Sequence, residues 1–210
     1  FYDTPGSYDV KLWVTNTAGT DSLLRTEYIT VAENSGSGPL KAWFAFDGNL
    51  KDSSNYRRHL AGTNGASPSY VPDVRGNTNM AYTASGNSNE YLTNTYYGVP
   101  ADGPRTVTAW VKTPEVGSRK TVVSWGLNQP GRMFNVMVFE GNIRVEAGGC
   151  NVQNDDSTVE RLDNNQWRHI AVSYDPADGG LASDVKLFID GEYYVNQPDS
   201  GDSFNSETTS

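Results

Sequence analysis

Two groups of residues in the sequence have types and spacing that could bind a ligand or a metal ion. In "GNIRVE", Arg144 and Glu146 are two positions apart, so they share a face if this run is a strand. A guanidinium and a carboxylate on one face can hold the hydroxyl, carboxylate or sulfate groups of a sugar polymer. In "FDGNLKDSS", Asp47, Asn49 and Asp52 supply the oxygen atoms that Ca²⁺ prefers. The first group indicates carbohydrate binding. The second indicates either a structural calcium ion or an ordinary polar turn.

Three further residues extend the predicted carbohydrate site. Asn135 lies in the run "RMFNVMVF", on the face opposite Phe134, and Arg132 at the start of this run offers a second cation for an anionic glycan. Trp125 ends the run "TVVSW", where its planar ring could stack on a sugar at the rim of a sheet. The alternative is an ordinary solvated sheet face with Trp125 in the core.

The spacings that glycoside hydrolysis requires are absent. A retaining glycosidase needs two carboxyl groups about 5 Å apart, and alternate residues of one strand can supply them as Glu-x-Asp-x-Glu. Here Glu140, Glu146 and Glu160 are isolated, and "NDD" (154–156) falls in a predicted loop. Neither a Gly-x-Ser-x-Gly nor a His-Glu-x-x-His motif occurs. The chain is therefore not expected to be an enzyme.

Composition narrows the range of partners. The net charge of −9 repels phosphate backbones, so nucleic acid is not an expected partner, whereas hard cations are compatible. Cys150 is the only cysteine, which excludes an internal disulfide, and two histidines, His59 and His169, are too few for an ordinary zinc site. No apolar run approaches the roughly 18–20 residues of a membrane span, so membrane insertion is not expected.

Short alternating runs predict the elements that position these residues. Strand-like runs occupy 40–46, 106–112, 121–125, 132–139, 143–146, 168–174 and 185–189. Asp190-Gly191 is a favoured pair for a type I′ hairpin turn and leads into "EYYVN". No run predicts a helix longer than one turn. The pattern indicates an all-β, antiparallel two-sheet sandwich and excludes a parallel α/β fold, which would need helices between the strands.

The first residues predict a separate hairpin. "SYDVKLWVTN" alternates apolar and polar residues, "NTAGT" is a turn, and "LLRTEYITV" returns as a second strand. Two strands do not make a stable sheet, so residues 1–33 are interpreted as the end of a larger domain. The Gly/Ser-rich residues 34–39 are interpreted as a linker.

This hairpin carries a family resemblance. The matching pieces are Pro5-Gly6-x-Tyr8, Asn16-x-Ala18-Gly19 and Tyr28-Ile29-Thr30-Val31. They resemble the C-terminal part of a PKD domain, the Ig-like β-sandwich of many secreted bacterial enzymes and surface proteins. The resemblance implies a partial Ig-like sandwich ahead of the linker and an extracellular or cell-surface location.

A second set of motifs follows the linker in a fixed order. They are "FAFDGNLKDSS", "VTAWVKT", "VVSWG", "GNIRVEAGG", "QWRHIAVSYD" and "VKLFIDG". In this order they resemble a laminin-G-like (concanavalin A-like) jelly roll of the bacterial type over residues 40–210. The resemblance implies that Ile170 and Val172 face the core, with Trp167 and His169 opposite, so His169 is expected to pack rather than to act as a base. It also implies a structural calcium ion near the Asp47 loop.

The resulting hypothesis is a non-catalytic module that recognises a polysaccharide within a larger secreted bacterial protein. An anionic polymer would be held mainly by Arg144. The alternative is a structural or adhesive module that contacts proteins at a cell surface or in an extracellular filament. Modules of this type end with two further strands, whereas the run from Asn196 to Ser210 is polar. The jelly roll is therefore expected to lack its final strands, which the rest of a longer polypeptide or a neighbouring chain would supply at an open strand edge.

Overall fold

The computed structural model is nearly all β. It describes residues 6–17, 19–31, 40–64, 67–87, 89–99, 103–114, 117–154, 161–194 and 196–198. The only helices in these ranges are two single 3₁₀ turns, η1 (Pro176–Asp178) and η2 (Ala182–Asp184). The described part of the chain holds no helix long and apolar enough to cross a membrane. The chain divides into two compact units, Phe1–Thr95 and Tyr96–Ser210.

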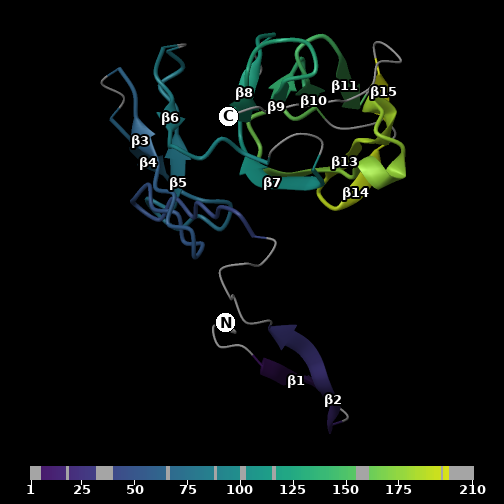
Figure 1. The fold of residues 1–210 in the computed structure, drawn as a ribbon. Coiled ribbons are helices and arrows are strands. Elements are labelled where there is room, and N and C mark those ends of the chain that lie inside the picture. The colour runs from purple at the N-terminus through teal and green to yellow at the C-terminus, as the bar shows by residue number, and fades with distance from the viewer. Residues whose placement is uncertain are drawn as a thin grey trace. The chain divides into compact units, whose positions relative to one another are not determined.

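The second unit is a sandwich of two antiparallel sheets (Figure 1). The five-stranded sheet has the order β15-β11-β10-β9-β8, and the four-stranded sheet has the order β14-β13-β12-β7. Their bounds are β7 Arg105–Val111, β8 Lys120–Gly126, β9 Met133–Phe139, β10 Asn142–Glu146, β11 Asn151–Asn154, β12 Arg168–Tyr174, β13 Lys186–Ile189, β14 Glu192–Tyr194 and β15 Asn196–Pro198. The predicted antiparallel jelly-roll sandwich is confirmed.

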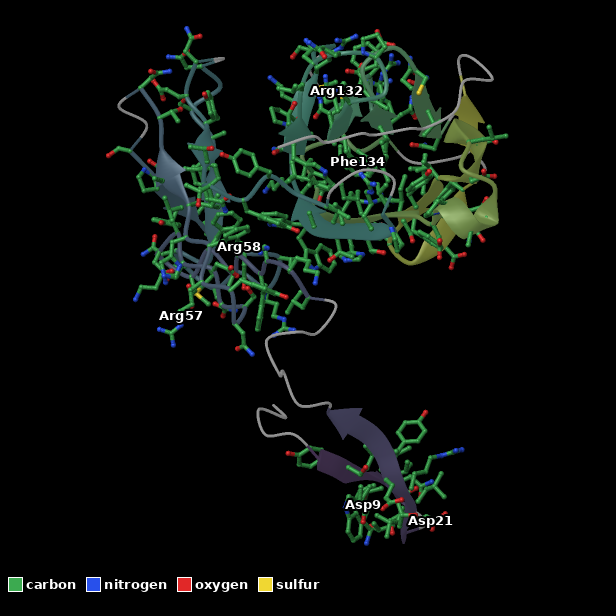
Figure 2. All side chains as sticks on the ribbon, in the orientation of Figure 1. Asp9, Asp21, Arg57, Arg58, Arg132 and Phe134 are labelled. Atoms are coloured by element: carbon green, nitrogen blue, oxygen red, sulfur yellow. The ribbon has the colours of Figure 1, made fainter. Side chains whose placement is uncertain are left out.

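The core lies between these sheets because every second residue of each strand points inward. One apolar cluster contains residues of both sheets. Its members with no exposed surface include Phe134 and Val136 of β9 and Ile170 and Val172 of β12. Figure 2 shows Phe134 between the two layers. The inward orientation predicted for Ile170 and Val172 is therefore correct.

The Asp190-Gly191 turn joins β13 to β14, and its carboxylate also contacts the start of β12. Asp190 and Gly191 have φ values of 51° and 90°, the left-handed conformation that a type I′ turn requires. The Asp190 carboxylate accepts a hydrogen bond from the His169 amide at 2.8 Å and pairs with Arg168 at 2.6 Å. The His169 ring lies on the outer face, with its centroid 5.3 Å from that of Trp110 on β7. This is a packing arrangement.

The described residues of the first unit form three antiparallel pairs of strands. The predicted hairpin is confirmed as β1 (Gly6–Asn16) with β2 (Gly19–Val31). The other pairs are β3 (Ala61–Gly62) with β6 (Leu92–Thr93), and β4 (Ser69–Val71) with β5 (Ala81–Thr83).

The strand predicted over residues 40–46 does not form. Its one ladder contact is an isolated bridge between Phe44 and Asp52. Phe46 has a φ of 55°, which an extended strand cannot contain. The Ser53 amide also donates to the Trp43 carbonyl at 2.7 Å, so the chain folds back on itself within ten residues instead of joining a sheet.

The predicted polar end of the chain also differs from the structure. Asn196–Pro198, expected to remain outside the sandwich, pairs with β11 as the edge strand β15. Residues 199–210 lie outside the described residues, so the expectation about the final strands remains a prediction.

Candidate functional site

The outer face of the five-stranded sheet brings together three of the predicted carbohydrate-binding residues. Glu146 of β10 lies opposite Asn135 of β9 on one side and Asn151 of β11 on the other. Arg144 lies opposite Met137 and Gln153 in the same way. All six point away from the core because their neighbours along each strand point into it. We call these six residues, Asn135, Met137, Arg144, Glu146, Asn151 and Gln153, the Arg144 face.

Hydrogen bonds hold the charged centre of this face in place. Arg144 Nε donates to Glu146 Oε1 at 3.0 Å, and its Nη1 donates to Gln153 Oε1 at 3.1 Å. The Arg144 guanidinium also lies 5.1 Å from the centroid of the Phe139 ring. The side chains of Arg144 and Glu146 are only 12% and 13% exposed. Arg144 was expected to present its charge to a ligand. Its guanidinium instead forms an ion pair with Glu146 on the same strand.

Arg119 adds a second cation to the same carboxylate. Its Nη2 lies 3.3 Å from Glu146 Oε1, and its side chain is 59% exposed. Arg119 could not be selected from the sequence, because it lies between two strand-like runs rather than within one. The Glu146 carboxylate therefore contacts two arginines, Arg144, which is largely buried, and Arg119, which is exposed.

Two asparagines beside Glu146 carry unsatisfied oxygen atoms. Asn135 Oδ1 and Asn151 Oδ1 are buried, and neither has a hydrogen-bond partner among the described residues. Leaving a buried acceptor unpaired costs about 1–3 kcal/mol, and native proteins rarely leave such groups without a partner. Asn151 was missed from the sequence although "NVQN" alternates polar residues with Val152. This alternation was the available signal.

Trp125 is not part of this face. A bulge between Thr121 and Val123 shifts the register of β8, so Trp125 lies opposite Phe134 rather than Met133. Its ring stacks on Phe134 with centroids 4.6 Å apart, and a Cβ added to Gly98 would lie 2.2 Å from the indole Cγ. Phe134 and Gly98 thus cover the Trp125 ring that was predicted to stack on a sugar. The alternative, a Trp125 packed against the core, describes this structure.

Arg132 lies outside the Arg144 face as well. It ends the turn that connects β8 to β9, where its Nη1 donates to Gln129 Oε1 at 2.9 Å. The Gly131 amide in this turn donates to the Ala147 carbonyl at 2.7 Å, which places the turn at the end of β10 that follows Glu146. In Figure 2, Arg132 lies farther out than Phe134. Arg132 is thus a residue at the end of the sheet.

The predicted calcium ligands form a hydrogen-bonded turn in the first unit. Asn49 Nδ2 donates to Asp47 Oδ1 at 2.7 Å, and Asn49 Oδ1 accepts from the Lys51 amide at 2.8 Å. Within the described ranges, no cluster of three or more His, Cys, Asp or Glu side chains is suited to a metal. A calcium ion bound by Asp47, Asn49 and Asp52 would have to replace hydrogen bonds of this turn.

Asp52 organises the loop around itself. Its Oδ1 accepts from the amides of Trp43 and Ser54 at 2.9 and 2.8 Å. Its Oδ2 accepts from the Ser54 hydroxyl and the Arg58 amide, both at 2.8 Å. Burial raises the pKa of Asp52, but the three amides and the hydroxyl together outweigh burial and hold the pKa below its usual value.

The calcium hypothesis predicts that excess chelator lowers the melting temperature of the wild-type chain. An ion that binds only the folded state stabilises it by RT ln(1 + [L]/Kd), about 2.7 kcal/mol at a hundred times Kd. Asp47→Ala should remove this response, and Asp73→Ala, in another turn of the same unit, should retain it. An unchanged melting curve in excess chelator would show that the loop is a turn without an ion.

A second surface lies on the outer face of the four-stranded sheet. Trp110 of β7 and Tyr193 of β14 are 52% and 53% exposed. Phe188 of β13 lies between these strands, with its ring centroid 5.5 Å from that of Tyr193. Together with His169 they form a row across all four strands, which we call the aromatic face. Sequence alternation could have identified it, because Trp110 and Phe188 occupy outward positions.

Comparisons with known proteins agree with this architecture. A family model described as the concanavalin A-like lectin/glucanases superfamily matches residues 85–210. Domain 4 of AbnA, a GH43 extracellular arabinanase from Geobacillus stearothermophilus solved in complex with arabinotriose, is similar, with a TM-score of 0.54 and 19% identity over 80% of each chain. At this identity the likeness shows the fold. No curated protein sequence matches.

Proposed function

The chain belongs to the concanavalin A-like lectin/glucanases superfamily, and we propose that it binds a polysaccharide on the Arg144 face. The observation that carries the proposal is the set of outward polar side chains on β9, β10 and β11, with the exposed Arg119 guanidinium 3.3 Å from Glu146 at its centre. A guanidinium supplies donors and a carboxylate supplies acceptors for sugar hydroxyls. The hydrogen bond from Arg144 Nε already holds Glu146 in place.

The proposed role is recognition without catalysis. Glu146 is the one carboxylate among the six residues of the Arg144 face, whereas both classes of glycoside hydrolysis use a pair. The structural neighbour is a domain of an extracellular arabinanase, which supports an extracellular or cell-surface location. A module of this kind would hold a larger protein on its polymer.

We further propose that residues 1–33 are the C-terminal part of a PKD-type domain and that residues 34–39 link it to the jelly roll. The support is the β1–β2 hairpin itself. Leu12 and Trp13 are adjacent and therefore point to opposite faces, yet they are 60% and 62% exposed. A hairpin with large apolar side chains on both faces fits a place within a larger sandwich.

The binding proposal is tested by a glycan array followed by calorimetry, with arabinotriose as the first soluble ligand. Arg144→Ala is expected to weaken binding at least tenfold, because Glu146 and Gln153 lose the side chain that positions them. Lys186→Ala is the control, since Lys186 lies on the other sheet and is an exposed cation paired with Asp178 of η1. Circular dichroism checks that both variants fold. Equal affinity of Arg144→Ala and wild type would place the site elsewhere.

The aromatic face supports the second candidate function, a structural or adhesive module. Trp110 and Tyr193 are more than half exposed, and aromatic side chains are enriched at protein–protein contacts. The two functions predict different losses. If the chain binds another protein through the aromatic face, Trp110→Ala should abolish that binding, whereas Arg144→Ala should leave it unchanged.

A further inference from the structure

The first unit carries a local concentration of positive charge. Residues 40–60 contain four lysines and arginines against two aspartates, whereas the whole chain has a net charge of −9. Three of these basic residues come together around one tyrosine. We call this group, Lys41, Tyr56, Arg57 and Arg58, the Tyr56 cluster.

Cations lie against the ring of Tyr56. The Arg58 guanidinium carbon is 4.2 Å from the ring centroid, and Lys41 Nζ is 5.5 Å from it. Lys41 Nζ also donates to the Tyr56 hydroxyl at 3.4 Å, and Arg58 Nη1 donates to the Lys41 carbonyl at 3.1 Å. A sugar ring would need an open aromatic face on which to stack, and Arg58 already occupies one face of Tyr56. The cluster therefore favours a ligand that is recognised by its charge.

Arg57 is the exposed cation of the cluster. Its φ is 50°, a left-handed conformation that few residues other than glycine adopt, and its amide donates to the Ser54 carbonyl at 3.3 Å. No hydrogen bond or ion pair joins its guanidinium to another described residue. Figure 2 shows Arg57 at the margin of this unit. An exposed guanidinium can hold a carboxylate through two parallel hydrogen bonds.

One buried carboxylate holds the two segments of the cluster together. Asp52 Oδ2 accepts from the Arg58 amide at 2.8 Å, and Oδ1 accepts from the amide of Trp43, two residues after Lys41, at 2.9 Å. Asp52 is 3% exposed, and its oxygens also accept from the Ser54 amide and hydroxyl. It therefore fixes the backbone that carries the cations. A ligand of the cluster would have little left to order on binding.

We propose that the Tyr56 cluster binds a short acidic peptide segment of a partner protein, with Arg57 as its main contact to a carboxylate. The cluster lies outside residues 85–210, which the family model matches, so this inference goes beyond the proposed function. The negative charge of the whole chain disfavours a long polyanion, which would extend beyond the cluster onto an acidic surface. Tyrosine and arginine are enriched among the residues that dominate protein–protein contacts.

Calorimetry of the full chain with N-acetylated, C-amidated hexaglutamate at 20 and 500 mM NaCl tests the inference. We expect binding at 20 mM that weakens at least about fivefold at 500 mM, because salt screens exposed charges. A chain of net charge −9 does not attract this peptide non-specifically, so binding requires a local cationic site. No binding of hexaglutamate at 20 mM NaCl, or inorganic sulfate bound as tightly as the peptide, would overturn the inference.

A pair of variants locates the binding. Arg57→Gln keeps a long polar side chain but removes the charge, so the affinity for hexaglutamate should fall about tenfold. The melting temperature should not change, because Arg57 is exposed. Arg25→Gln is the matched control, since Arg25 is another exposed arginine of the first unit, with its guanidinium 5.4 Å from the Tyr28 ring centroid. This control should bind hexaglutamate like the wild type.

Three results with these variants would overturn the proposal. Equal affinity of Arg57→Gln and wild type would place the peptide elsewhere. Equal losses in Arg57→Gln and Arg25→Gln would show a general effect of charge. Hexagalacturonate, which carries the same number of carboxylates as hexaglutamate, provides the third. If it binds more tightly than the peptide and Arg57→Gln removes this binding, the cluster takes an acidic glycan instead of a peptide.

Discussion

Replacing Phe134 with alanine is expected to lower the free energy of unfolding by about 3–5 kcal/mol, the range for a large aromatic removed from a core. Phe134 has no exposed surface and stacks on Trp125 at 4.6 Å. The buried guanidinium of Arg105 lies 5.2 Å from the centroid of the Phe134 ring. The variant would leave a cavity bordered by an indole and a cation that lose their packing partner.

Urea unfolding of the full chain, with hydrogen exchange of the β9 and β10 amides, measures this loss. Trp110→Ala is the matched control, because it removes an aromatic side chain from the outer face of the other sheet. Its cost should be about 1 kcal/mol or less, as expected for an exposed position. A loss below about 1 kcal/mol for Phe134→Ala would contradict the sandwich core described here.

The second large effect concerns Asp52. Asp52→Asn keeps the shape of the side chain, but its NH₂ group in place of Oδ2 can accept from neither the Ser54 hydroxyl nor the Arg58 amide. Losing hydrogen bonds to a buried carboxylate should lower the free energy of unfolding by about 2–4 kcal/mol. Measuring it in excess chelator excludes a contribution from bound calcium. Asp47→Asn, an exposed position in the same loop, should cost less than about 1 kcal/mol.

The Asp52 contribution should also depend on pH. Its pKa in the folded chain lies below the reference value of 3.8, so the folded state favours the ionised form. The stabilisation is then fully present above the unfolded-state pKa and is lost as the pH falls through the lower folded-state pKa. Wild type and Asp52→Asn should differ at pH 7 and converge as the pH falls from about 4. A constant difference between pH 7 and pH 2.5 would contradict this account.

Much of the second unit could be predicted from its alternation. The run 168–174 coincides with β12, and the Asp190-Gly191 turn forms as expected, because one buried face fixes the period of each strand. The strand predicted over residues 40–46 does not form, for a reason that the alternation of apolar and polar residues does not reveal. Hydrogen bonds to Asp52 and the positive φ of Phe46 bend this segment away from a sheet.

Part of the candidate site could also be predicted from the alternation of its strands. Arg144, Glu146 and Asn135 share a face because β9 and β10 form a regular hairpin. Trp125, expected at the rim of a sheet, instead stacks on Phe134, because a single bulge in β8 reverses the two faces for every residue after it. The alternation in "NVQN" could have shown that Asn151 points outward, but its place beside Glu146 depends on the pairing of β10 with β11, which only the folded chain shows.

The most direct test of glycan binding on the Arg144 face is an NMR titration of the ¹⁵N-labelled chain with arabinotriose, or with the first oligosaccharide that binds. If the ligand binds there, the side-chain NH₂ signals of Asn135 and Asn151 and the amides of β10 should shift most and saturate with one Kd. Shifts confined to Trp110, His169 and Tyr193 on the aromatic face, or no shifts with any oligosaccharide, would contradict it.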